Sequence, residues 1–159
     1  MGAEAMINFP VDADMLTPHA RPMLAIDQVL SADDSGARVS LIVPVDAWYM
    51  NADGRWDEIA GIELISQAAA AFNGLTKISG ASGASAAPVV GYLAEVRRYQ
   101  ATGGVSAGDA LVIDIRKMTA FGGFLVMAGE LRRGDDVIAT AELTFWQETR
   151  PPRLPDGTK

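Results

Sequence analysis

The sequence has 159 residues, of which 49% are hydrophobic and 21% charged, and it contains no cysteine and one histidine. A chain of this length can bury one core without crosslinks, so we expect a single domain over residues 1–159. The lack of cysteine excludes disulfides, thiolate catalysis and cysteine-ligated metals, and the single histidine, His19, excludes sites with several histidines. We therefore expect no metal and no cofactor.

The charge of the chain argues against nucleic acid as a partner. Its 13 basic and 20 acidic residues give a net charge of -7, which disfavours binding to a phosphate backbone. No stretch has the roughly eighteen apolar residues that a membrane span needs, and the N-terminus lacks the pattern of a secretion signal. The sequence thus predicts a soluble, cytoplasmic protein that acts neither on nucleic acid nor in a membrane.

In chain order, the first expected elements are two strands, at 23–30 and 38–45, followed by a helix at 56–73. The helical segment contains strong helix formers at 68–71 and is followed by Gly74, a typical C-terminal signal. Residues 59–72 are apolar or small on nearly all sides, so the helix must be covered by strands. This pattern predicts an α+β fold, with a curved antiparallel sheet wrapped around one long, buried central helix.

The small, polar residues 79–87 predict a flexible connection after the helix. Alternating apolar residues and glycine-rich turns then predict antiparallel strands at 89–99, 109–118, 123–133 and 136–147. Three of the nine residues in 151–159 are proline, which disfavours a further strand. We therefore expect the folded body to cover about 16–147, with 151–159 as a tail.

Three segments carry a resemblance to a known family. Residues 16–29 read LTPHARPMLAIDQV, residues 63–68 read ELISQA, and residues 105–111 read VSAGDAL. They are similar to the patterns L-P-H-x-x-P-x-L-x-x-D-x-V, E-x-x-A-Q-x and V-x-x-G-D-x-L of the hotdog-fold 3-hydroxyacyl-acyl-carrier-protein dehydratases. Thr17 is inserted beside the Pro-His pair, and Ser66 replaces the alanine of the helix motif. The resemblance implies a hotdog fold.

The chain departs from that family just before the helix. The usual catalytic histidine lies fourteen residues before the motif glutamate, and this position holds Tyr49 in the present sequence. The combination of an early Pro-His, the pattern Trp56-x-x-x-x-Gly61-x-Glu63 and no histidine before the helix resembles the dehydratase-like branch found with aryl polyene synthesis. In this branch, some members are expected to be non-catalytic partner subunits.

The resemblance implies a function and its partners. The expected activity is the reversible loss of water from (3R)-3-hydroxyacyl thioesters on an acyl carrier protein, in fatty acid or polyene-type biosynthesis. The expected assembly is a homodimer, or a heterodimer with a related dehydratase. Two alternatives remain, a non-catalytic acyl-binding partner of an active dehydratase and a hotdog acyl thioesterase that uses Glu63 to activate water.

Dehydration requires a base for the α-proton, an acid for the leaving hydroxyl group and N–H donors for the thioester carbonyl. The expected acid is Glu63, because burial on the helix would raise the pKa of its carboxyl group. His19 is the expected base, because its unperturbed pKa lies near neutrality. Free N–H groups at the helix N-terminus would bind the carbonyl. The alternatives are a structural ion pair for Glu63 and a turn-fixing hydrogen bond for His19.

Four further residues are candidates for substrate binding or for support of the catalytic pair. Gln67 lies one turn after Glu63 and could orient it, or it could simply pack in the core. Tyr49 stands at the position of the missing histidine and could transfer protons, or it could line a tunnel wall or pack in the core. Gly61 and Trp56 belong to the branch pattern.

Basic pairs on three expected strands could also form a patch for an acidic carrier protein, with solvated strand ends as the alternative. The pairs are Arg97-Arg98, Arg116-Lys117 and Arg132-Arg133.

Overall fold

The computed structural model describes residues 6–79 and 89–149. Within these ranges, one long helix and several antiparallel strands confirm the expected α+β class. The elements are β1 (Val11–Asp12), a 3-10 turn (Ala13–Met15), β2 (Gln28–Ala32), β3 (Gly36–Ile42), α1 (Ala60–Ile78), β4 (Val89–Ala101), β5 (Ala110–Phe121), β6 (Phe124–Arg133) and β7 (Asp136–Thr149).

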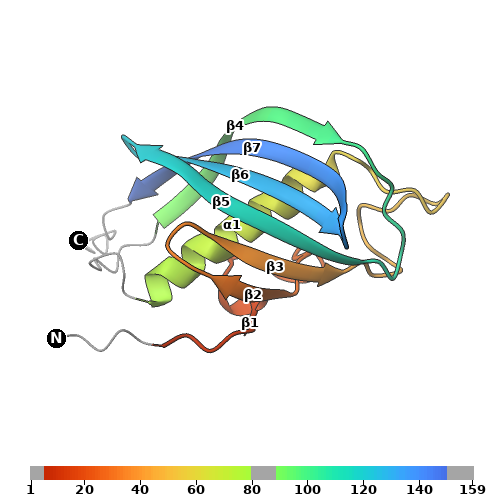
Figure 1. Ribbon diagram of the computed structural model, residues 1–159, viewed down its shortest axis with the longest axis horizontal. Coiled ribbons are helices and arrows are strands. Elements are labelled where there is room, and N and C mark those ends of the chain that lie inside the picture. The colour runs from red at the N-terminus through yellow and green to blue at the C-terminus, as the bar shows by residue number, and fades with distance from the viewer. Residues whose placement is uncertain (1–5, 80–88, 150–159) are drawn as a thin grey trace, which may run out of the picture.

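The strands form a seven-stranded sheet in the order β1-β2-β3-β5-β6-β7-β4, and every neighbouring pair is antiparallel. Figure 1 shows the sheet curving around α1, which lies diagonally against its concave face. The first strand after the helix, β4, pairs with the last strand, β7, and therefore forms one edge of the sheet.

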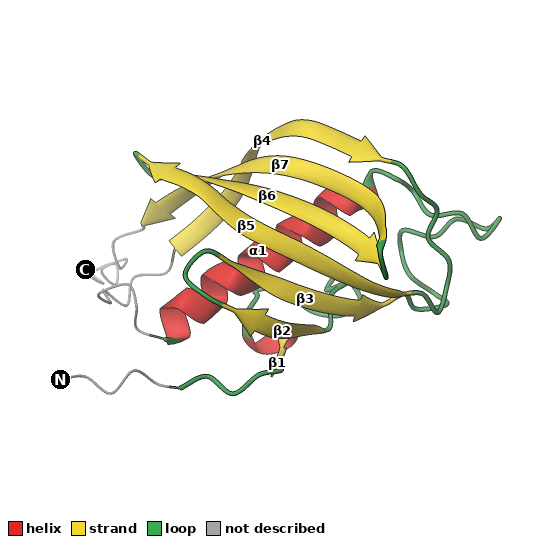
Figure 2. Cartoon of the chain, in the orientation of Figure 1, coloured by secondary structure: helices red, strands yellow, loops and turns green. Residues whose placement is uncertain are grey.

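The core lies between α1 and the concave face of the sheet (Figure 2). Leu64 and Ile65 of the helix are buried against apolar side chains that point inward from the central strands. Gly129 of β6 allows a close approach, because a Cβ atom there would overlap the side chain of Ile65. Burial of this apolar face holds the helix in place.

The expected helix at 56–73 is wrong at both ends, since α1 spans Ala60–Ile78. At its start, the Asp57 carboxylate accepts the N–H of Ile59 at 3.2 Å, so the chain before residue 60 forms a turn. At its end, Gly74 does not stop the helix. It lies against the backbone of Leu16, and a Cβ atom at this position would overlap the Leu16 carbonyl oxygen. This glycine is therefore explained by close packing and not by a helix cap.

The expected strand at 23–30 is also wrong in its first half, because β2 begins only at Gln28. Side chains take the place of a neighbouring strand here. The Arg21 guanidinium donates to the carbonyl oxygens of Leu24 at 3.0 Å and Ile26 at 3.1 Å. The Gln67 side chain bonds two further backbone groups, the N–H of Ala25 and the carbonyl oxygen of Met23. Four backbone groups of residues 23–26 therefore have side-chain partners in place of a strand.

The other expected strands correspond to β3 to β7 with small shifts at their ends. Elements extend from Val11 to Thr149, beyond the expected limits of 16–147. Of the expected connection at 79–87, the structure describes only Ser79, and the tail at 151–159 lies outside the described residues. No helix in the described part of the chain is both long and apolar enough to cross a membrane.

Candidate active site

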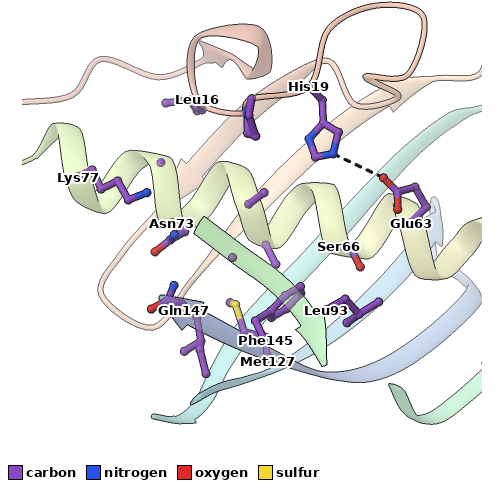
Figure 3. Close-up of a pocket in the computed structure, with 16 residues that line it drawn as sticks. Leu16, His19, Glu63, Ser66, Asn73, Lys77, Leu93, Met127, Phe145 and Gln147 are labelled. Atoms are coloured by element: carbon purple, nitrogen blue, oxygen red, sulfur yellow. Dashed lines mark ion pairs between the residues drawn. The ribbon is translucent and has the colours of Figure 1, made fainter. Parts of the chain in front are cut away.

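A pocket of about 260 Å³ runs along one flank of α1. It is bounded by the loop that holds Leu16 to His19 on one side and by β4, β6 and β7 on the other (Figure 3). Its middle is apolar and its two ends are polar, as in many sites for ligands with an apolar chain. The apolar middle is lined by Ala69, Ala70, Leu93, Leu125, Met127 and Phe145.

A stripe of polar helical residues forms one wall of this pocket. Glu63, Ser66, Asn73 and Lys77 all line it, and their spacing of three, seven and four residues places them on one side of α1. The helix is covered on most sides, as expected, and this polar stripe is the side that faces the pocket. Sequence analysis missed Ser66, Asn73 and Lys77 as pocket residues, although a polar stripe on an apolar helix was a usable signal.

His19 and Glu63 meet at one end of the pocket. The His19 Nε2 and Glu63 Oε1 atoms are 3.9 Å apart, which brings together the two expected catalytic side chains from the N-terminal loop and the helix. Figure 3 shows the imidazole pointing toward the carboxylate. Their side chains are 35% and 39% exposed, so the burial expected for Glu63 is not observed. At this separation both groups can face a ligand that enters the pocket.

Gln67 links the two segments that carry this pair. Its side chain is fully buried, and its Nε2 group donates to Glu63 Oε1 at 2.9 Å and to the carbonyl oxygen of Met23 at 2.9 Å. Its Oε1 atom accepts the N–H of Ala25 at 2.8 Å. Gln67 therefore holds the Glu63 carboxylate and fixes the loop after His19 against the helix.

His19 makes no hydrogen bond within the described residues. Its Nδ1 atom is buried without a partner there, and its Nε2 atom faces Glu63 at 3.9 Å. The turn-fixing hydrogen bond that the alternative role of His19 requires is therefore not found in these residues. Arg21 performs that task instead, through bonds to two backbone carbonyls and to the Asp27 carboxylate at 3.0 Å.

Tyr49 does not belong to the pocket. It is buried in the core, and its ring packs edge-on against Trp48 with 5.1 Å between the ring centroids. Burial, with a smaller contribution from the negative charge of Asp27, raises the pKa of the Tyr49 hydroxyl to about 12. A proton-transfer role at the pocket is not supported for this residue, because Tyr49 does not line the pocket and its hydroxyl group stays protonated at neutral pH.

Trp56 and Gly61 also lie outside the pocket lining. The indole N–H of Trp56 donates to the carbonyl oxygen of Gly103 at 3.2 Å, which fastens the segment before α1 to the loop between β4 and β5. Gly61 packs against Tyr99, whose hydroxyl donates to the carbonyl oxygen of Glu58. In this structure, the pattern that joins Trp56, Gly61 and Glu63 fixes the start of the helix.

The first N–H groups of α1 are already used. Those of Ala60, Gly61 and Ile62 donate to the carbonyl oxygens three residues earlier, at 2.9, 3.1 and 3.1 Å. The expectation that free N–H groups at the helix N-terminus bind a thioester carbonyl is therefore not met, because the tight first turn consumes these donors.

The basic pairs do not form a free cationic patch. Four of their six members are ion-paired with nearby carboxylates, which favours the alternative of solvated strand residues. These pairs are Arg97–Glu95 at 2.9 Å, Arg98–Glu142 at 3.7 Å, Arg133–Asp109 at 2.9 Å and Arg132–Glu130.

Sequence comparison matches residues 11–154 to the family described as ApeP-like, ApeP dehydratase. The chain belongs to the ApeP-like dehydratase family. The match covers the helix, all seven strands and the pocket, and it confirms the dehydratase-like role and the aryl-polyene-type branch implied by the motifs. No curated protein matches the sequence.

Solved structures confirm the hotdog fold of this ApeP-like chain. The dehydratase heterocomplex ApeI:P from Xenorhabdus doucetiae matches with a TM-score of 0.77 and 23% identity, over 88% of this chain and 93% of that chain. A probable thioesterase from Bartonella henselae matches with a TM-score of 0.60 and 17% identity, over 76% and 99% of the two chains. A thioesterase from Haemophilus influenzae matches with a TM-score of 0.60 and 14% identity, over 92% of each chain.

Proposed function

We propose that this protein catalyses the reversible loss of water from (3R)-3-hydroxyacyl thioesters on an acyl carrier protein, in cytoplasmic fatty acid or polyene-type biosynthesis. The observation that carries the proposal is the His19–Glu63 pair at one end of a pocket with an apolar middle. A thioester at the pair would place its acyl chain along Leu93, Leu125 and Phe145. Family membership supports the same chemistry.

In the proposed reaction, His19 Nε2 takes the α-proton and the Glu63 carboxyl group protonates the 3-hydroxyl group, which leaves as water. The electrons of the α-C–H bond form the double bond, and those of the C–O bond leave with the oxygen. The cycle moves one proton from Glu63 to His19, and return of that proton across the 3.9 Å gap restores the pair. The α-carbon and the β-carbon of the substrate are adjacent, so His19 can act on the first while the neighbouring Glu63 acts on the hydroxyl group of the second.

Gln67 acts as a positioning residue in this proposal. Its bond to Glu63 Oε1 holds the carboxyl group, which leaves Oε2 to face the substrate. Its two backbone bonds hold the loop that carries His19, so one buried amide maintains the distance between acid and base.

Two alternatives have support of their own. A non-catalytic partner subunit is favoured by Tyr49 at the position of the usual histidine and by the heterocomplex of the Xenorhabdus doucetiae relative. A thioesterase is favoured by the similar thioesterase structures. Incubation of the purified chain with 3-hydroxyacyl thioesters distinguishes the three. Dehydration gives 2-enoyl absorbance without free thiol, hydrolysis gives free thiol, and a partner subunit gives neither product until an active dehydratase is added.

We also propose that the protein functions as a dimer, with a second copy or with a related dehydratase subunit. The outer edge of β4 has no strand partner within the described residues, and it exposes Tyr92, Leu93 and Val96. An antiparallel partner strand would continue the sheet there and cover the pocket beside Leu93. Light scattering at micromolar concentration should give the mass of a dimer. A strictly monomeric protein, alone and with the partner subunit, would contradict this proposal.

A further inference from the structure

The hydroxyl group of Ser66 is an uncommitted polar group beside the catalytic pair. Ser66 lies three residues after Glu63 on the same side of α1, and its side chain lines the pocket (Figure 3). The Oγ atom is buried and has no hydrogen-bond partner within the described residues. A buried hydroxyl group without a partner destabilises the fold, so its position in a binding pocket points to a ligand atom as the missing partner.

Apart from His19, whose Nδ1 atom also lacks a partner within the described residues, the other candidate hydrogen-bonding groups near this end of the pocket are already bonded. Both functional atoms of the Gln67 amide are bonded, to Glu63, Met23 and Ala25. The first N–H groups of α1 donate within the tight turn at the start of the helix. Ser66 can therefore offer a hydrogen bond to the substrate without breaking an existing one.

The polarity of the pocket indicates which substrate oxygen Ser66 meets. Beyond Ser66 along α1 the wall becomes apolar at Ala69 and Ala70, which suits the tail of an acyl chain. The thioester carbonyl then lies toward the end formed by His19 and Glu63. The carbon that carries the 3-hydroxyl group is two bonds from the carbonyl carbon and lies further inward. Side chains three residues apart on a helix are close neighbours, so Glu63 and Ser66 can contact one oxygen atom together.

We infer that the Ser66 hydroxyl group hydrogen-bonds the 3-hydroxyl group of the substrate, and that it selects 3-hydroxyacyl thioesters over acyl thioesters that lack this group. The inference deepens the proposed function and rests on it for the identity of the ligand. It also explains why serine stands where the helix motif of the resembling dehydratases has alanine. Alanine would pack at this position without an unpaired polar atom, and it is the better helix former.

The test is the binding of two ligands to Glu63→Gln protein, in which the hydroxyacyl ligand is not consumed. These are the N-acetylcysteamine thioesters of 3-hydroxyoctanoic acid and octanoic acid, measured by titration calorimetry. Adding Ser66→Ala should raise the Kd of the hydroxyacyl ligand about tenfold and that of the octanoyl ligand less than twofold. Ser66→Thr keeps a hydroxyl group and should retain part of the preference.

Thr76→Ala is the matched control, because Thr76 is a hydroxyl residue of the same helix outside the pocket lining, bonded to the carbonyl oxygen of Asn73 at 2.8 Å. It should leave both Kd values unchanged. Ser66→Ala in the otherwise unchanged protein should also raise Tm by about 2–4 °C, because it removes an unpaired buried hydroxyl group. A structural hydroxyl group would instead give a lower Tm and equal changes for both ligands.

An unchanged preference in Ser66→Ala, or no binding of the hydroxyacyl ligand to the Glu63→Gln protein, overturns the inference. Its failure is separable from failure of the proposed function. If the unmodified protein dehydrates the thioester but Ser66→Ala keeps the preference, only the contact is wrong. If the protein converts nothing but Ser66→Ala loses the preference, the contact stands and the proposed reaction is wrong.

Discussion

Replacement of Glu63 by glutamine is expected to lower the rate of dehydration by about two to four orders of magnitude, with little change in Tm. Glutamine keeps the size of the side chain, and its Oε1 atom can still accept the bond from Gln67 that Glu63 accepts at 2.9 Å. What it loses is the proton for the leaving hydroxyl group. The measurement is the initial rate of 2-enoyl absorbance together with a thermal melt.

Glu58→Gln provides the control for this variant. Glu58 is an exposed carboxylate just before α1, and it does not line the pocket. Both the rate and Tm should stay close to those of the unmodified protein. If Glu63→Gln instead lowers Tm and retains turnover, Glu63 is a structural ion and its assignment as the acid is wrong.

His19→Gln is expected to abolish activity, and raising the pH should not restore it. The sequence contains no other histidine and no cysteine that could replace the base. Tyr49 cannot replace it either, because its hydroxyl group has a pKa of about 12, is buried and lies outside the pocket. Rates measured from neutral to mildly alkaline pH test this prediction, and full turnover by His19→Gln would eliminate His19 as the base.

Position 49, where the resembling dehydratases have their catalytic histidine, offers a second test of the assignment of His19 as the base. Placing histidine at position 49 in the His19→Gln protein recreates the sequence spacing to Glu63 that the related dehydratases use. The structure gives a reason to expect no rescue, since Tyr49 points into the core beside Trp48. Recovery of activity in this double variant would show that position 49 reaches the pocket. Stimulation of a second dehydratase by an inert unmodified protein would favour the partner-subunit alternative.

The architecture followed from patterns that depend on local physics. A segment with apolar residues all round must be covered, and the alternating segments after it supply the sheet that covers it. The errors occur where distant contacts override these local signals. Gly74 is a helix terminator by composition, but its place against the Leu16 backbone requires glycine inside the helix. Residues 23–26 were expected to belong to a strand, but the side chains of Arg21 and Gln67 bond four of their backbone groups in place of a partner strand.

The candidate site was predictable in part. The resemblance paired Glu63 with His19, and the helical repeat placed Gln67 beside Glu63. Core packing was one of the alternatives for Tyr49, but the sequence could not choose among them, because spacing along the chain does not determine which way a loop residue points. Its segment folds back through a bridge between Met50 and Trp56, which leaves the Tyr49 ring in the core.

The most direct test of the account is hydration of a 2-enoyl thioester by the purified protein in D₂O. Hydration is the reverse of the proposed reaction, so the acid–base pair must deliver one deuteron to the α-carbon while the hydroxyl group adds to the β-carbon. After transfer to H₂O, mass spectrometry should find a 3-hydroxyacyl thioester with one deuterium retained on the α-carbon. This product should be absent with His19→Gln. Release of the free acid and thiol, or no deuterated product from the unmodified protein with or without a partner subunit, would contradict the account.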